Sequence, residues 1–457
     1  MAWLNERAEG IKMNYRPQIH DYIQNHKKEI TETLKQLVEI PSVIGKAEKN
    51  APFGRNCADV LKLTEELYSN NGFETELDQN SGYLLAYYGK GEKSLGLFAH
   101  ADVVPVDDEW VFTNPFKPLE KDGFIIGRGV TDDKAAVVIS LYCAKILKEL
   151  NIPFNSRLVM FTGANEESGM DDIRAYVKSH KAPDFSLVCD AAFPLFRGDK
   201  GILHFMATSN KKMEEVTDFY GGQAYNIVLG KASAVIGGKT VTANGMSRHA
   251  ALPEGSVNAG YLLSKRLADD NTLCESDRKQ MKFISSLLEK YYGEIFGLED
   301  DDAVFGKLTV INGIVKMTDG KIGLSFDMRY GMSADVENAR TKIKEFFNKN
   351  NWSVEFFDKG KPFLMPLDDP YLKKCLDTYI KYTGDNNAQP YINAGATYAR
   401  CLPKAVEIGT SVGGNGTLSG MPQGHGGVHQ PDECINEEGL LNAIELTMLM
   451  LIECDKI

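Results

Sequence analysis

The feature that most restricts the fold of this chain is a short apolar strand that ends in two polar residues, His100 and Asp102. Residues 95–99 read Leu-Gly-Leu-Phe-Ala, and a glycine-bracketed turn about thirty residues later brings Asp132 and Asp133 to the start of an expected helix. Short apolar strands that alternate with helices indicate an α/β unit with a largely parallel sheet. Open sheets of this kind bind ligands beyond the carboxyl ends of their strands.

The pattern around this strand predicts an α/β domain interrupted by an inserted domain. Before residue 190, helical spacing at 22–40, 58–69, 135–150 and 172–179 alternates with strand-like runs at 83–88, 157–162 and 185–189. Between 200 and 365, strand-like runs at 202–208, 225–228, 307–315 and 321–330 surround a helical stretch at 277–292. We therefore expect residues 1–196 and 368–457 to form a mostly parallel sheet flanked by helices, and residues 197–367 an inserted α+β lid domain.

Side chains that can bind a cation lie at four places where strands are expected to end. Each has an ordinary explanation when taken alone, as a solvated loop charge or as an acid at a helix N-terminus. Together, however, so many carboxylates would repel one another unless a cation lay among them. The sequence therefore predicts a metal site built from His100 and Asp102, Asp132 and Asp133, Glu166 and Glu167, and Asp190.

The residue types indicate which metals and which chemistry to expect. Carboxylates and histidine without cysteine fit hydrolytic zinc, manganese or cobalt sites, and they exclude a cysteine-rich structural zinc site. A shared carboxylate could bridge two ions ~3.5–4 Å apart, as in two-metal hydrolases. Asp102 is well placed to orient the His100 imidazole. One of Glu166 and Glu167 can bind metal while its neighbour takes a proton from water.

Composition excludes several other classes of protein. A net charge of −12 argues against nucleic-acid binding, which needs clustered lysine and arginine. No apolar run approaches the roughly 18–20 residues that span a bilayer, and the first thirty residues lack the apolar segment of a secretory signal. Eight scattered cysteines without a C-x-x-C pair indicate a reducing compartment. We expect a cytoplasmic protein without nucleic-acid or membrane partners.

Six motifs resemble, in order, those of the dinuclear metallopeptidases related to aminoacylase and glutamate carboxypeptidase. They are H-A-D-V-V-P from His100, G-R-G-V-T-D-D-K from Gly127, G-A-N-E-E-S-G from Gly163, C-D-A from Cys189, G-M-S-R-H-A-A-L-P-E-G-S-V-N-A from Gly245 and H-Q-P-D-E from His429. The resemblance covers nearly the whole chain, and the long insert is similar to that of the bacterial dipeptidase branch. It implies hydrolysis of dipeptides or short peptides by a metal-bridging water.

The resemblance also implies a role for each matching metal-site residue. His100 and Asp190 would hold one divalent ion, Glu167 and His429 the other, and Asp132 would bridge them. Zinc is the first expectation for both ions, with manganese or cobalt as alternatives. Glu166 would be the general base and Asp102 would support His100. The peptide bond between Asp132 and Asp133 would be cis.

Three further residues are implied to act on the substrate. His249, in the insert, would stabilise the tetrahedral intermediate. Arg329 would pair with the free carboxylate of the substrate, as suits a bidentate guanidinium, and Arg400 is the alternative clamp. An insert of about 180 residues, longer than a compact dimerising lid, favours a monomer in which His249 acts within its own chain.

Some alternatives stay open at this point. His425 competes with His429 as a metal ligand, since it lies four residues earlier in the same glycine-rich loop. Alanines at 394 and 396, where the family has glycine, leave substrate size open. The same dinuclear site could serve an N-acyl-amino-acid amidohydrolase instead. A binding protein on a degenerate hydrolase scaffold would lack a ligand or the base, and all of the expected ones are present.

Overall fold

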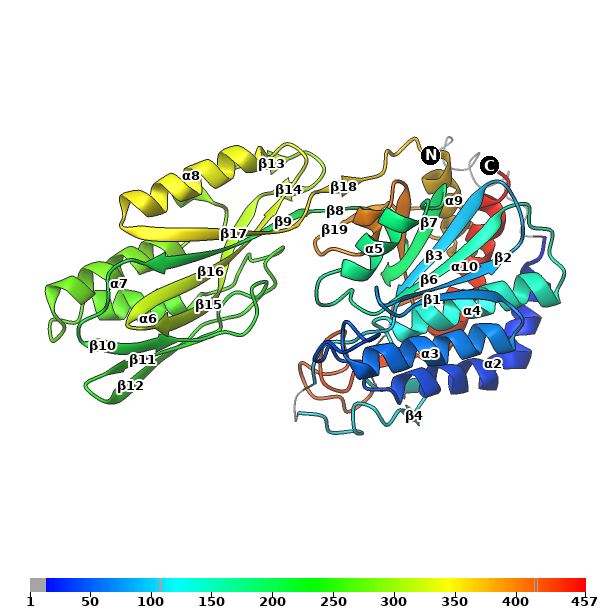
Figure 1. The fold of residues 1–457 in the computed structure, drawn as a ribbon, viewed down its shortest axis with the longest axis horizontal. Coiled ribbons are helices and arrows are strands. Elements are labelled where there is room, and N and C mark those ends of the chain that lie inside the picture. Colours follow the sequence, from blue (N-terminus) through cyan, green and yellow to red (C-terminus); the bar gives the residue numbers. More distant parts are fainter. Residues whose placement is uncertain (1–13, 107–108, 415, 417) are drawn as a thin grey trace. The chain divides into compact units, whose positions relative to one another are not determined.

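The computed structural model describes residues 14–106, 109–414, 416 and 418–457 (Figure 1). The chain divides into two compact units, which are described separately below. Unit 1 comprises residues 1–198 and 364–457, and unit 2 is Asp199–Phe363. Within the described residues, no helix is both long enough and apolar enough to cross a membrane.

Unit 1 is built on a sheet with adjacent parallel strands at its centre. These run in the order β6 (Arg157–Gly163), β3 (Ser94–His100), β7 (Phe185–Ala191) and β20 (Ala405–Gly409). Antiparallel strands extend the sheet at both sides, which confirms the expected mostly parallel α/β fold. The flanking strands are β1 (Glu74–Asp78), β2 (Tyr83–Tyr88), β8 (Phe196–Asp199), β18 (Phe363–Leu364) and β19 (Tyr391–Asn393).

A small second sheet in unit 1 joins distant parts of the chain. Its antiparallel strands run in the order β21 (Cys434–Asn436), β5 (Phe124–Ile126) and β4 (Leu119–Lys121). Pairing of Cys434 with Ile126 brings the end of the H-Q-P-D-E motif beside the turn that leads to Asp132.

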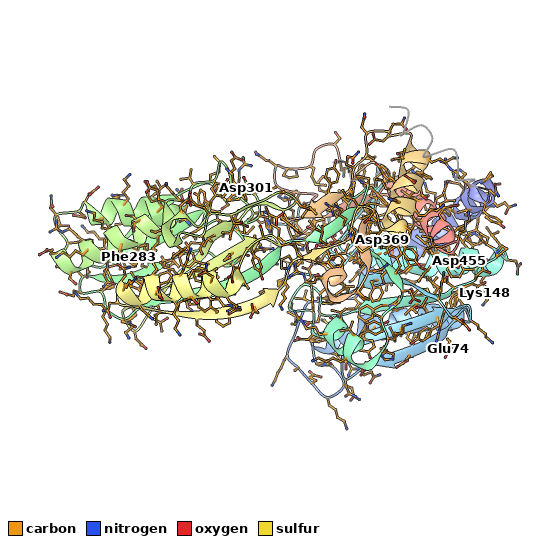
Figure 2. The ribbon with its side chains drawn as sticks, turned by 90° about the horizontal axis from the view of Figure 1, so that it is seen from above. Glu74, Lys148, Phe283, Asp301, Asp369 and Asp455 are labelled. Atoms are coloured by element: carbon orange, nitrogen blue, oxygen red, sulfur yellow. The ribbon has the colours of Figure 1, made fainter. Side chains whose placement is uncertain are left out.

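Two of the long helices of unit 1 begin at a side-chain N-terminal cap. The Asn436 side chain accepts a hydrogen bond from the Gly439 N–H at the start of α10, and Asp369 caps α9, which begins at Pro370. Asp455, labelled in Figure 2, lies just after α10. Its carboxylate accepts hydrogen bonds from the Asn155 and Ser156 N–H groups at 2.9 and 2.7 Å. The α4 helix, which follows Asp132 and Asp133, is buried along almost its whole length. The helices are α2 (Arg16–Val38), α3 (Arg55–Asn70), α4 (Lys134–Glu149), α5 (Asp171–Ser179), α9 (Pro370–Thr383), η2 (Tyr398–Cys401) and α10 (Glu437–Cys454).

Unit 2 has the expected α+β character. Its larger antiparallel sheet runs β15 (Thr309–Thr318), β16 (Lys321–Tyr330), β9 (Gly201–Ser209) and β17 (Trp352–Gly360). Its core contains an aromatic cluster, in which the stacked rings of Phe205 and Phe326 lie 4.7 Å apart. Phe283, labelled in Figure 2, packs on Trp352. The other elements are β10 (Val216–Tyr220), β11 (Lys231–Ile236), β12 (Lys239–Asn244), β13 (Asp301–Asp302), β14 (Gly306–Lys307), α6 (Ala259–Ala268), α7 (Glu275–Leu288), η1 (Glu294–Phe296) and α8 (Val336–Lys349).

The prediction of a strand at residues 225–228 in unit 2 is wrong. Residues 225 and 226 form a turn, and Ile227 makes an isolated bridge to His249. Tyr225 instead stacks on the His204 ring at 4.6 Å, so this apolar run contributes side-chain packing rather than a strand. The helix expected at 277–292 is α7, which ends at Leu288.

Candidate metal centre

The candidate site lies at the carboxyl edge of the parallel strands of unit 1. His100, the last residue of β3, is directly paired with Gly163, the last residue of β6. The loop after Gly163 carries Glu166 and Glu167, and Asp190 lies near the end of β7. The position agrees with the general rule for ligand sites in parallel α/β sheets.

Asp132 lies between two histidines. Its Oδ1 is 3.0 Å from His100 Nε2, and its Oδ2 is 3.0 Å from His429 Nε2. His429 Nε2 is also 3.1 Å from Glu167 Oε1, while His100 Nε2 is 3.8 Å from Asp190 Oδ1. The structure therefore brings all of the expected metal ligands together, with each oxygen of one carboxylate facing a different imidazole.

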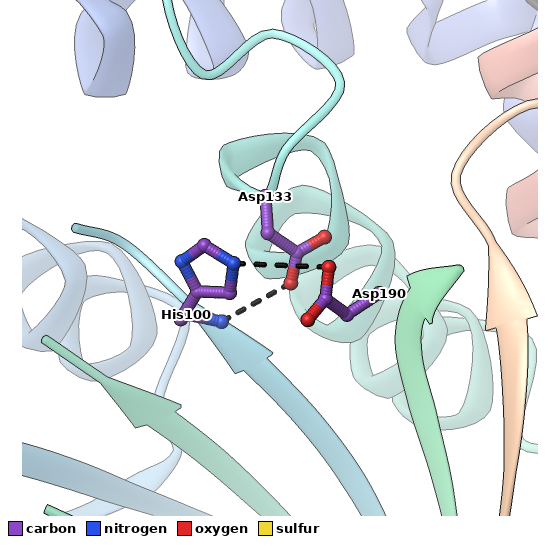
Figure 3. A group of neighbouring side chains, drawn as sticks. All are labelled: His100, Asp133 and Asp190. Carbon is purple, nitrogen blue, oxygen red and sulfur yellow. Dashed lines mark hydrogen bonds and ion pairs between the residues drawn. The ribbon is translucent and has the colours of Figure 1, made fainter. Parts of the chain in front are cut away.

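Asp133 belongs to the cluster, as the residue pattern predicted, although the resemblance gave it no role as a ligand. Its Oδ2 accepts a hydrogen bond from the His100 backbone N–H at 3.1 Å, and Figure 3 shows His100, Asp133 and Asp190 grouped around one point. One ligand atom from each lies within 4.8 Å of the others, as is also true of His100, Asp132 and Glu167. The Asp132–Asp133 peptide bond is cis, as the resemblance implied.

The electrostatics of the cluster fit divalent cations. Burial raises the pKa of Glu167 to about 7 and that of Asp190 to about 6, and the nearby Asp132 adds to both shifts. Burial alone would lower the pKa of His429, but Asp132 and Glu167 raise it to about 11. Asp133 Oδ1 is buried without a hydrogen-bond partner among the residues that the structure describes. Bound cations would neutralise these crowded carboxylates. Without cations, the repulsion between the carboxylates is relieved only by bound protons.

Asp102 supports both His100 and the loop of the expected base. Its carboxylate oxygens accept hydrogen bonds from the Glu166 and Glu167 backbone N–H groups at 3.1 and 3.2 Å. The closest Asp102 atom to His100 Nδ1 is its backbone carbonyl oxygen, at 2.9 Å, whereas the carboxylate Oδ1 lies at 3.4 Å. The imidazole is thus oriented mainly by a main-chain acceptor, and the buried carboxylate holds the Glu166–Glu167 loop.

Glu433 is a supporting residue that sequence reasoning missed. Its buried carboxylate accepts hydrogen bonds from the backbone N–H groups of Gly129, Thr131 and Asp132 at 3.1, 2.9 and 3.2 Å. The Arg128 guanidinium donates to the same carboxylate at 2.7 Å and to the His429 carbonyl oxygen at 3.3 Å. The pair therefore joins the turn that carries Asp132 to the loop that carries His429. The only available signal was the acidic end of H-Q-P-D-E.

The two histidines of the glycine-rich loop have different surroundings. His429 reaches Asp132 and Glu167, whereas His425 Nδ1 is 2.7 Å from Asp432 Oδ2. The other Asp432 oxygen accepts a hydrogen bond from the Phe112 N–H at 2.9 Å, so this carboxylate ties His425 to the segment before β4. This geometry favours His429 over His425 as the ligand.

The expected substrate residues lie in both units. His249 is exposed in unit 2, where its Nδ1 accepts a hydrogen bond from the Ala251 N–H at 3.3 Å. Arg329 is buried in β16 and makes a bidentate pair with Asp327, through Nε at 2.7 Å and Nη2 at 2.8 Å. Arg400 is half-buried in the short η2 helix of unit 1.

Known proteins are similar to this chain in sequence and in fold. A putative dipeptidase of Staphylococcus epidermidis is 30% identical over 466 residues, covering 93% of this chain and 96% of that protein. The fold is similar to that of human carnosine dipeptidase 1, with a TM-score of 0.64, 15% identity, and coverage of 97% and 99%. It is also similar to the Bacillus subtilis YXEP protein, described as a dinuclear metal binding peptidase, with a TM-score of 0.54, 11% identity, and coverage of 95% and 99%. Residues 96–453 match the family described as Peptidase family M20/M25/M40, and the chain belongs to that family.

Proposed function

We propose that this protein is a metal-dependent dipeptidase that hydrolyses the peptide bond of dipeptides or similarly short peptides. The observation that carries the proposal is the position of Asp132, with its oxygens 3.0 Å from His100 and 3.0 Å from His429. A carboxylate so placed is suited to bridge two cations. Family membership and the dipeptidases among the similar proteins support the substrate class.

The proposed cofactor is a pair of divalent ions, of which zinc best fits a set of histidines and carboxylates, ahead of manganese and cobalt. His100 and Asp190 would hold one ion, and Glu167 and His429 the other, with Asp132 shared. Asp133 extends this set on the His100 side. When bound, such ions polarise a carbonyl group and lower the pKa of water.

Glu166 is proposed as the general base. Its Oε1 is buried and has no hydrogen-bond partner among the described residues, while Asp102 fixes its backbone. Burial raises the pKa of Glu166 well above its ordinary value, and the nearby Asp190 adds to the shift, so this carboxyl group accepts a proton more readily than an exposed glutamate does. Glu166 would take a proton from the attacking water and deliver it to the leaving amine.

Unit 2 is proposed to act as a lid that completes the site, within the sequence-based limits 197–367. His249 would steady the oxyanion of the tetrahedral intermediate. Arg329 would bind the free carboxylate of the substrate, and the bidentate pair with Asp327 supports this role by fixing the guanidinium. Arg400 is the alternative clamp.

We further infer a cytoplasmic monomer. The eight scattered cysteines support a reducing compartment. The long insert supports a monomer in which His249 serves its own site. Light scattering on the purified protein tests the second inference, and a stable dimer that needs His249 from its partner would contradict it.

A substrate panel tests the proposed activity. The purified protein, loaded in turn with Zn²⁺, Mn²⁺ or Co²⁺, is assayed on a set of dipeptides and on their N-acetylated counterparts. The proposal expects hydrolysis of free dipeptides. Preferential cleavage of the N-acyl compounds would instead identify an amidohydrolase with the same dinuclear site. Full metal occupancy without hydrolysis of any short peptide would identify a binding protein.

A further inference from the structure

The loop that carries Glu166 is held by two buried carboxylates on its backbone. The N–H groups of residues 164 and 165 both donate to Asp172 Oδ2 at 2.8 Å. The N–H groups of residues 166 and 167 donate to the two oxygens of Asp102 at 3.1 and 3.2 Å. Consecutive amides are thus bound in pairs, and both carboxylates are almost completely buried. Asp102 belongs to the metal centre, whereas Asp172 has no part in the chemistry described so far.

Asp172 shares its Oδ2 with the hydroxyl group of Tyr398. The tyrosine donates to this oxygen at 2.6 Å, and both side chains are 0% exposed. The Tyr398 ring meets the Phe161 ring edge-on at 5.4 Å and the His100 ring edge-on at 6.4 Å. The phenol is therefore fixed from several sides, and it can hold the carboxylate in a single orientation.

Gly163 shows how closely this pair is packed against the strand end. A Cβ atom at this position would lie 2.0 Å from Tyr398 Oη and 2.3 Å from Asp172 Oδ2. Both contacts are far below van der Waals distance, so any larger residue would push the pair away from the loop. The glycine that begins G-A-N-E-E-S-G therefore leaves the space that the Tyr398–Asp172 pair occupies.

We propose that Tyr398 and Asp172 are positioning residues for the general base. The proposal rests on the function proposed above, in which Glu166 moves the proton. Removing the Tyr398 hydroxyl would take away the side-chain donor to Asp172 Oδ2. Among the described residues, the remaining anchor of the carboxylate outside the loop is the Ile173 N–H, which donates to Oδ1 at 2.7 Å, so the grip of Asp172 on the amides of residues 164 and 165 would loosen. The carboxylate of Glu166 would then lose its fixed position, and a misplaced base slows the chemical step rather than substrate binding. Because Tyr398 begins η2, the same pair also connects the Glu166 loop to the segment of Arg400.

The Tyr398→Phe variant tests this proposal, with Tyr142→Phe as its matched control. Tyr142 on α4 is also 0% exposed, but its hydroxyl interacts with the Thr33 hydroxyl, at 3.4 Å, and with Glu29 rather than with a carboxylate that holds the Glu166 loop. We expect Tyr398→Phe to lower kcat about tenfold, with KM within about twofold of the wild type and the metal content unchanged. Hydrogen exchange of the peptide covering residues 164–167 should become faster in this variant alone.

A purely structural role predicts a different result. It would lower the melting temperature and the metal-loaded fraction, while kcat per loaded molecule stayed at the wild-type value. That outcome, or kcat and hydrogen exchange equal to those of Tyr142→Phe, overturns the proposal.

A second variant checks that the two residues act as a unit. The effects of Asp172→Asn and Tyr398→Phe on kcat should be non-additive when the two substitutions are combined. Additive effects would contradict the proposal that the two residues act as a unit. If Asp172→Asn does not fold, the Tyr398→Phe comparison alone decides. If the wild type hydrolyses no dipeptide, the proposed function fails, but hydrogen exchange still tests the positioning of the loop.

Discussion

Replacing Glu433 with glutamine should damage the metal centre although the residue touches no metal. The Glu433 carboxylate accepts hydrogen bonds at both oxygens, from Thr131 and Asp132 on one and from Gly129 and Arg128 on the other. Glutamine has nearly the same shape, but one of its two terminal atoms is itself a donor. Whichever way the amide turns, two buried N–H donors face an NH₂ group.

The structure gives the size of the expected effect. Each unsatisfied buried donor costs about 1–3 kcal/mol, so two cost about 2–6 kcal/mol. The Arg128 guanidinium is only 2% exposed, and breaking a buried charge pair costs about 3–5 kcal/mol. The two figures describe the same loss in part, so we expect Glu433→Gln to destabilise unit 1 by about 3–5 kcal/mol. The turn that carries Asp132 and the loop that carries His429 should be the segments that lose stability.

Thermal melting and metal analysis measure this effect. The matched control is Glu445→Gln, because Glu445 is equally buried but its partners Arg16 and His20 are 41% and 51% exposed. Water can replace a lost carboxylate there, so the control should cost about 1 kcal/mol or less. Adding Arg128→Met to Glu433→Gln should restore part of the stability by removing the unpaired charge. The reasoning is refuted if Glu433→Gln has the same melting temperature as Glu445→Gln and keeps its full metal content.

Other predictions concern the metals and the proposed base. Glu166→Gln should lower kcat at least a hundredfold with full metal content, and loss of metal would show that base and ligand are reversed. His429→Ala should lose one metal equivalent, whereas His425→Gln should keep both; the opposite pattern would exchange their roles. The pKa of His429 is about 11 without metal, so metal binding at pH 7 should release protons, and the metal affinity should fall as the pH falls. Titration calorimetry in buffers of different ionisation enthalpy measures the number of protons released. Chelation should abolish hydrolysis, and added Zn²⁺, Mn²⁺ or Co²⁺ should restore it.

The sequence was informative wherever the chemistry follows directly on a strand. His100 and Asp190 lie at the ends of apolar runs, and parallel strands bring such ends to one edge of a sheet. No long-range information is needed for that inference. His429 is different, because it lies on an irregular loop more than 260 residues from Glu167. Only the family resemblance placed it at the site.

The supporting residues could not have been recognised in the same way, and the reason is physical. Asp172 and Glu433 act by accepting hydrogen bonds from backbone N–H groups. Because almost every residue type has such a group, the sequence does not indicate which of them donate to a given side chain. An acid at the start of a helix, such as Asp172 in α5, is ordinarily explained by the helix dipole. What distinguishes it is complete burial beside Tyr398, 226 residues away. The ligands of such a site can be found from residue type and spacing, but the groups that aim them depend on the folded chain.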